Sequence, residues 1–181
     1  MILVLKRVAL WPGLLAAVFF LVLAHPAQAR SCAGGRVALN AGKSFLSAAH
    51  SRSPAAFSRA LRRHAAMRSI AFFALGRYRR KLPRKAYGRF VRLSTRYVSR
   101  KLASYADSIR GSAVDVTGCR GNMVETRLAP SGQRVVWRIR GGRVVDVKIR
   151  GVWLSLALRD HYANLIRQAG GDMARFMAQL K

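Results

Sequence analysis

The chain has 181 residues, of which 34 are Lys or Arg and only six are Asp or Glu, and its formal net charge is +28 at pH 7. This length is sufficient for one domain with a hydrophobic core and excludes two domains of ordinary size. In the cytosol such a charge would favour a nucleic-acid-binding protein, whereas outside it the charge favours lipid headgroups, lipopolysaccharide or cell-wall polymers.

Residues 1–29 have the pattern of a cleavable secretory signal peptide. Lys6 and Arg7 form a positive n-region, and the apolar stretch 8–24 that follows contains no charged residue. An Ala-Gln-Ala triplet then ends at Ala29, and small residues at its first and third positions are typical of a signal-peptidase site. The sequence therefore predicts export, with cleavage after Ala29.

A permanent membrane anchor is the alternative interpretation of this N-terminus. A spanning helix needs about 20 apolar residues, and the apolar run here is shorter and contains Pro12-Gly13. We therefore expect residues 30–181 to be released as a single domain. Cys32 and Cys119 are an even pair, which is compatible with one disulfide in an oxidising compartment, and neither has the neighbours of a zinc site.

The first half of the released chain has helical patterns. Residues 37–50 are rich in Ala and Leu, and Ser53-Pro54 predicts the start of a second helix that ends at Gly76. The longest periodic segment is 83–111, with one apolar face. Four arginines lie on its other face: Arg89, Arg92, Arg96 and Arg100. We expect these arginines to be solvated.

The second half changes to an alternating pattern. Apolar residues alternate with charged ones over 114–116, 124–128, 135–139 and 145–149, and Gly141-Gly142 is typical of a hairpin loop. Helical spacing returns after residue 154. The sequence therefore predicts an α+β fold in which helices pack on a curved four-stranded antiparallel sheet, with an apolar pocket between the layers as one possibility and a filled core as the other.

Few residues are suited to catalysis. Four of the six acidic residues fall at outward positions or at a helix end, and His161 lies beside the apolar face of the C-terminal helix, as a core or pocket histidine would. No catalytic triad order, phosphate-binding glycine loop or metal-ligand cluster is present in the sequence. We expect neither an enzyme nor a bound cofactor or metal.

Several segments, in order, resemble the MlaC (toluene-tolerance) family of periplasmic lipid-binding proteins. The segment Gly141–Leu154 is similar to the family's hairpin-plus-strand signature, and Leu158–Tyr162 with Gly170–Leu180 is similar to its C-terminal ending. Upstream, Ala74–Arg79 and Phe90–Tyr105 resemble two helical motifs of the family.

Departures from the family pattern suggest a divergent member. Arg150 stands where the family usually has a glutamate, Trp153 where it has a serine and Leu158 where it has a tyrosine. The hopanoid-associated HpnM-type branch is one place where such a chain could belong.

The resemblance implies a soluble periplasmic carrier that holds the tails of a phospholipid or hopanoid and exchanges them with an ABC-type membrane transporter. Its arginine faces would attract it to anionic membrane surfaces, and export removes nucleic acid as a partner. Ten residues are predicted to contribute to the pocket: Phe72, Leu75, Tyr97, Val116, Val124, Trp137, Val145, Val147, Val152 and Tyr162.

Two alternatives remain open from the sequence. One is a basic exported protein that binds an envelope polyanion through its arginine faces and has a filled core without an internal ligand. The other is a hydrolase on a similar scaffold, which would need a clustered acid–base pair that the sequence does not reveal.

Overall fold

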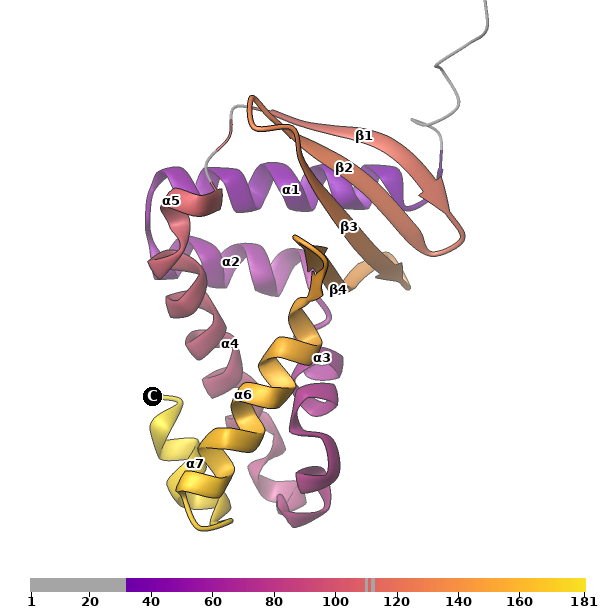
Figure 1. Ribbon diagram of the computed structural model, residues 1–181. Coiled ribbons are helices and arrows are strands. Elements are labelled where there is room, and N and C mark those ends of the chain that lie inside the picture. Colours follow the sequence, from indigo (N-terminus) through magenta and orange to yellow (C-terminus); the bar gives the residue numbers. More distant parts are fainter. Residues whose placement is uncertain (1–31, 110, 112) are drawn as a thin grey trace, which may run out of the picture.

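The computed structural model describes residues 32–109, 111 and 113–181. The predicted signal peptide and its cleavage point after Ala29 lie outside these residues. Figure 1 shows helices α1 and α2 side by side next to the sheet, and α3, α4, α6 and α7 gathered at the other end of the molecule. Within the described residues, no helix is both long enough and apolar enough to span a membrane.

Helices form the whole first half of the described chain and its C-terminal end. Their bounds are α1 Gly35–His50, α2 Pro54–His64, α3 Met67–Leu75, α4 Tyr87–Ser104, α5 Ala106–Ile109, α6 Leu154–Gln168 and α7 Met173–Gln179, with 3-10 turns at Gly76–Lys81 and Arg84–Ala86. The Ser53 hydroxyl accepts a hydrogen bond from the backbone N–H of Ala56 and so caps α2, as the Ser-Pro pair predicts.

Two of the predicted helices are each divided in the structure. The segment from Pro54 to Leu75 forms two helices because the chain extends at Ala65 and Ala66, where the N–H of Ala66 donates to the carbonyl of Val144 at 2.8 Å. The long segment that follows Pro83 is interrupted at Tyr105, between α4 and α5. The first of these interruptions is a tertiary contact that local periodicity does not contain.

The sheet is antiparallel and has the strand order β1-β2-β3-β4-β5. Its strands are β1 Ala113–Arg120, β2 Met123–Ala129, β3 Gln133–Arg140, β4 Arg143–Ile149 and β5 Val152–Trp153. The four predicted strands are all present, and the two-residue strand β5 was not predicted. The α+β fold is therefore confirmed, with five strands in place of four.

The buried apolar residues form two main groups, which we call the helical core and the sheet core. The helical core joins α3, α4, α6 and α7 and includes Phe72, Phe90, Tyr162 and Phe176. The sheet core joins α1 to the inner face of the sheet and includes Ala38, Ala41, Val124 and Trp137.

Small residues let α1 lie close to the sheet. A Cβ atom added at Gly42 would stand 3.0 Å from the Val114 Cγ1 atom, so no larger side chain fits there without a shift. A disulfide between Cys32 and Cys119 joins the chain just before α1 to β1, with the two Cα atoms 6.4 Å apart. The helix α1 is thus held against β1 by close packing at its middle and by a covalent link just before its first turn.

Candidate functional site

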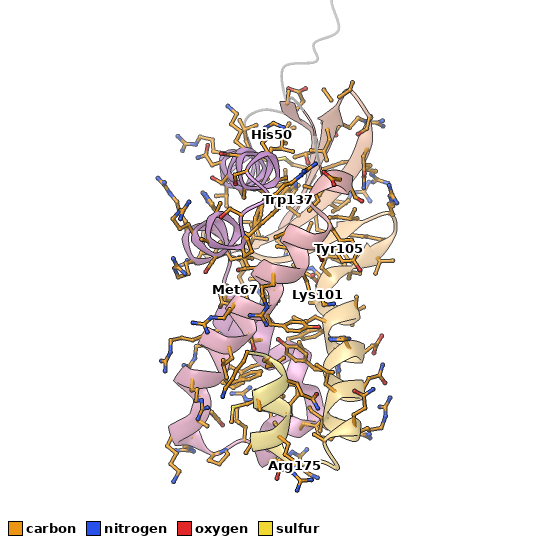
Figure 2. All side chains as sticks on the ribbon, turned by 90° about the vertical axis from the view of Figure 1, so that its left-hand side faces the viewer. His50, Met67, Lys101, Tyr105, Trp137 and Arg175 are labelled. Carbon is orange, nitrogen blue, oxygen red and sulfur yellow. A yellow bond between two sulfur atoms is a disulfide. The ribbon has the colours of Figure 1, made fainter. Side chains whose placement is uncertain are left out.

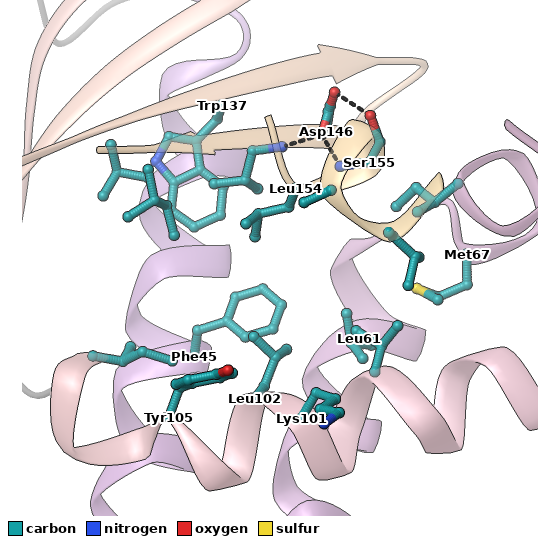
Figure 3. Close-up of a pocket in the computed structure, with 18 of the residues that line it drawn as sticks. Phe45, Leu61, Met67, Lys101, Leu102, Tyr105, Trp137, Asp146, Leu154 and Ser155 are labelled. Atoms are coloured by element: carbon teal, nitrogen blue, oxygen red, sulfur yellow. Dashed lines mark hydrogen bonds between the residues drawn. The ribbon is translucent and has the colours of Figure 1, made fainter. Parts of the chain in front are cut away.

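A cavity of about 430 Å³ lies between the helical core and the sheet core. The inner face of the sheet forms one wall, α1 and α2 form the second, and α4 with the first turns of α6 forms the third. Figure 3 shows Trp137 and Leu154 on one side of this space, and Phe45, Leu102 and Tyr105 on the other. The volume lies within the range of about 300–1,000 Å³ that is typical of small-molecule sites.

Trp137 of β3 is fixed by a hydrogen bond at its polar edge. Its Nε1–H donates to the buried Thr126 hydroxyl at 2.8 Å, and Phe45 of α1 stacks toward its ring with centroids 6.3 Å apart. Val147, the register partner of Trp137 on β4, lines the same wall. Because the one polar atom of the indole has a partner, this wall presents an apolar surface to the cavity.

Polar side chains collect at the edge of the cavity between α4 and α6. The hydroxyl of Tyr97 hydrogen-bonds the Nε2 atom of His161, and the two rings stack with centroids 5.5 Å apart. Lys101 and Tyr105 lie beside them, and Tyr105 is 60 % exposed, so the cavity opens to solvent here (Figure 2). We call Tyr97, Lys101, Tyr105 and His161 the mouth.

Burial shifts the acid–base behaviour of the mouth. It lowers the pKa of His161 below its ordinary value, and the positive charge of Lys101 lowers it further. Burial also raises the pKa of Tyr97, with a smaller opposing effect from Arg100. Both side chains are therefore neutral at pH 7, and Lys101 is the positively charged group of the mouth.

One buried carboxylate also borders the cavity. Asp146 of β4 accepts hydrogen bonds from the backbone N–H of Val147 at 2.9 Å and from that of Ser155 at 3.0 Å, and the Ser155 hydroxyl donates to it at 2.6 Å. Arg138 is 3.9 Å away. Asp146 thereby caps the first turn of α6 from the neighbouring strand and fixes the start of this helix on the sheet.

The arrangement is suited to holding an apolar molecule. The Asp146–Ser155 pair is occupied with its own hydrogen bonds, and no histidine is bonded to either member in the described part of the chain. Among the described residues, no group of three His, Cys, Asp or Glu side chains could hold a metal ion. What the cavity offers a ligand is apolar surface with a few polar groups at one edge.

The structure brings together three of the ten pocket residues predicted from the sequence. Tyr97, Trp137 and Val147 line the cavity, from α4, β3 and β4 respectively. His161, interpreted from the sequence as a core or pocket histidine, lies at the mouth.

Four predicted residues are buried away from the cavity lining. Phe72, Leu75 and Tyr162 are in the helical core, where they pack against other helices. Val124 is in the sheet core and is 1 % exposed. All four are inward-facing, as their periodicity predicts, but their neighbours fill the space in front of them.

The other three predicted residues lie at the surface or at an irregularity. Val116 borders a separate groove between α1 and β1, and Val152 is 52 % exposed on β5. Val145 has no register partner because a bulge shifts the pairing after Arg138, and Val144 is the buried residue in its place.

Sequence reasoning missed most of the helical side chains of the cavity. Examples are Phe45, Leu61, Leu102, Leu154 and Leu158. A signal was available for the first: Phe45 and Leu46 follow the small residues of α1, which indicates that the helix has more space to fill after Gly42. Leu102 belongs to the apolar face that the sequence predicted for α4.

Three comparisons with known proteins bear on this site. A family model described as "MlaC protein" matches residues 37–181. A phospholipid-binding protein from Ralstonia solanacearum, solved in complex with a phospholipid, has a similar fold with a TM-score of 0.65 and 15 % sequence identity, and the match covers 80 % of this chain and 93 % of that one. No curated protein is significantly similar in sequence.

Proposed function

The chain belongs to the MlaC family, and from this premise we propose that it is a lipid carrier whose cavity holds the apolar tails of a phospholipid or a hopanoid. The observation that carries this proposal is the apolar cavity between the helical core and the sheet core, which has polar groups only at its edge and at the occupied Asp146–Ser155 pair. The bound phospholipid of the Ralstonia solanacearum protein, which shares this fold, supports it.

The physical chemistry of the cavity fits this role. Each CH₂ group moved from water into an apolar site gains about 0.8 kcal/mol, so a lipid tail is retained without any covalent chemistry. The headgroup would stay near the mouth, where Lys101 supplies a positive charge and Tyr97 and Tyr105 supply hydroxyls. Of the sequence-predicted residues, we assign Trp137 and Val147 to tail contacts and Tyr97 to the mouth.

The proposal extends to the compartment and to the partners of the carrier. We infer that residues 1–29 direct export, that residues 30–181 work in the periplasm as one lipid-binding domain, and that the protein exchanges lipid with an ABC-type membrane transporter. The Cys32–Cys119 disulfide supports an oxidising compartment. The departures at Arg150, Trp153 and Leu158 are the reason to include a hopanoid among the candidate cargoes.

The test compares two valine substitutions. Val147→Phe adds bulk inside the cavity, whereas Val116→Phe makes the same change on a half-buried strand residue outside it. Each protein is purified without detergent, examined by native mass spectrometry, and its lipid extracted and identified. We expect wild type and Val116→Phe to carry lipid and Val147→Phe to carry much less, while all three unfold cooperatively.

Repeated absence of lipid from the wild-type protein would overturn the carrier proposal. It would favour the alternative of a basic exported protein that binds an envelope polyanion without an internal ligand. Equal lipid in both variants would instead place the cargo outside the cavity. The identity of the extracted lipid distinguishes a phospholipid from a hopanoid.

A further inference from the structure

Another concave site lies on the far side of α4 from the mouth. It is a groove of about 910 Å³ between α2, the start of α3 and the middle of α4. Small side chains border it, among them Ala55, Ala65 and Ala66 with the buried Thr95 and Ser99. Five arginines also line it: Arg62, Arg68, Arg92, Arg96 and Arg143. We call it the arginine groove.

No carboxylate balances these arginines. All six acidic residues of the chain lie in the described part, and none of them lines the groove. The ion pairs found among the described residues do not involve Arg62, Arg68, Arg92, Arg96 or Arg143. Several guanidinium groups therefore face one recess without an acidic partner, in a chain that has five or more basic residues for every acidic one.

Existing contacts hold only part of this set in place. Arg143 donates to the carbonyls of Arg62 and Arg63 at the end of α2, and Arg62 donates to the Ser58 hydroxyl. Arg92 and Arg96 are exposed, one turn apart on α4. Because residues four apart lie on the same face of a helix, these two guanidinium groups can reach the same ligand.

The arginine groove and the mouth use opposite faces of one helix. Arg92 and Lys101 are nine residues apart on α4, which at 100° per residue places them about half a turn from each other. Met67, labelled in Figure 2, lines both the cavity and the groove and so forms part of the wall between them. A molecule in the groove would leave the mouth open.

We propose that the arginine groove is the docking site for an acidic segment of a partner polypeptide. The recess can admit a chain, and the planar forks of guanidinium groups match carboxylates in a bidentate manner. A bilayer fits less well, because a membrane on this face would turn the mouth away from the lipid. The exclusion of a bilayer rests on the proposed carrier function, whereas the unbalanced charge and the shape of the groove are independent of it.

The test removes two charges at each of two places. Arg92→Gln/Arg96→Gln changes the groove, and Arg120→Gln/Arg127→Gln removes the same charge from exposed positions on β1 and β2. Binding of a fluorescently labelled polyglutamate peptide is measured by anisotropy at fixed ionic strength. We expect the groove variant to bind at least about tenfold more weakly, because charge-assisted hydrogen bonds are lost, and the sheet variant to change by about twofold or less.

Three results would overturn the proposal. These are no peptide binding by the wild-type protein, equal weakening in both variants, and groove-dependent binding of phosphatidylglycerol vesicles with no binding of the peptide. The third result would identify the groove as a membrane contact. Lipid content is measured in the same preparations, so loss of peptide binding with lipid retained separates failure of docking from failure of cargo binding.

Discussion

In the helical core, three aromatic rings that are fully buried meet directly, with Tyr162 and Phe176 centroids 5.3 Å apart and Phe90 within 6.2 Å of both. In the sheet core, α1 meets the strands through alanine and glycine, and the bulky residues Phe45 and Trp137 face an open space. The first region fills its interior with large side chains. The second brings its backbones close together at one end and leaves room at the other.

This difference explains where the cavity lies. The aromatic rings bring α4 and α6 together at the lower end of Figure 1, and the disulfide and Gly42 bring α1 and β1 together near the sheet. Neither region supplies enough side-chain volume to close the space where they meet. The cavity is therefore a product of two well-packed regions joined at an angle, and both contribute to its walls.

The largest expected effect comes from removing one phenylalanine from each region. Phe90→Ala leaves a void in a filled core and should lower the free energy of unfolding by about 4 kcal/mol. Phe45→Ala makes the same change at the edge of an existing cavity, so we expect a loss of about half as much. Urea unfolding of the lipid-free proteins measures both values.

Equal losses in the two variants would contradict the comparison, since they would mean that Phe45 is packed as tightly as Phe90. Lipid bound to the wild-type protein would stabilise it and obscure the difference. The proteins are therefore stripped of lipid before unfolding, and the extract is checked by mass spectrometry.

Most of the fold was predictable from periodicity. Alternation identified four strands and the Gly141-Gly142 hairpin, and Ser53-Pro54 marked the start of α2. The break at Ala65 was not predictable, because it depends on a hydrogen bond to Val144, far away in the sequence. The place of Val145, predicted to contribute to the pocket, depends in a similar way on pairing, since the bulge after Arg138 shifts the alternation of β4.

The cavity was predictable only in part. Periodicity identifies which side of an element is apolar, and Tyr97, Trp137 and Val147, chosen on that basis, line the cavity. It does not say whether the facing side chain is near or far. Phe72 and Tyr162 have the same sequence signature as the cavity residues, yet their neighbours pack against them. The distance between opposing faces is set by tertiary structure.

The connection between the two regions can be broken at Asp146. Asp146→Ala removes the acceptor for two backbone N–H groups and the Ser155 hydroxyl at a buried site, and should lower the free energy of unfolding by about 2–3 kcal/mol. Asp172→Ala is the control. Asp172 also accepts from two backbone N–H groups, at the start of α7, but it is exposed to solvent, so we expect a clearly smaller loss.

The lipid content of these variants sharpens the comparison. Because Asp146 fixes the first turn of α6, which lines the cavity, Asp146→Ala should also reduce the lipid that co-purifies. Asp172→Ala should not, since α7 packs on the far end of the helical core. Equal lipid in both would show that the cavity keeps its shape without this cap.

The smallest effect concerns pH and the histidines next to the cavity walls. The pKa values of His161 and His64 are both lowered from 6.5 in the folded protein, chiefly by burial and further by neighbouring cations. The unfolded chain therefore binds more protons than the folded one between the lowered pKa values and 6.5. Stability from this source is complete above pH 6.5 and is lost as the pH falls through that window.

We expect the melting temperature to fall modestly between about pH 7.5 and about pH 5, and the fall to be smaller in His161→Gln. His64→Gln provides the matched comparison, because His64 lies at the end of α2, hydrogen-bonded to Ser44, and does not line the cavity. If lipid occupies the mouth, the surroundings of His161 change while those of His64 do not: burial by the tails lowers the pKa of His161 further, whereas the phosphate of a headgroup raises it. The pH dependence due to His161 alone should then differ between the lipid-free and the lipid-loaded protein, and an unchanged pH dependence would indicate that the ligand does not reach the mouth.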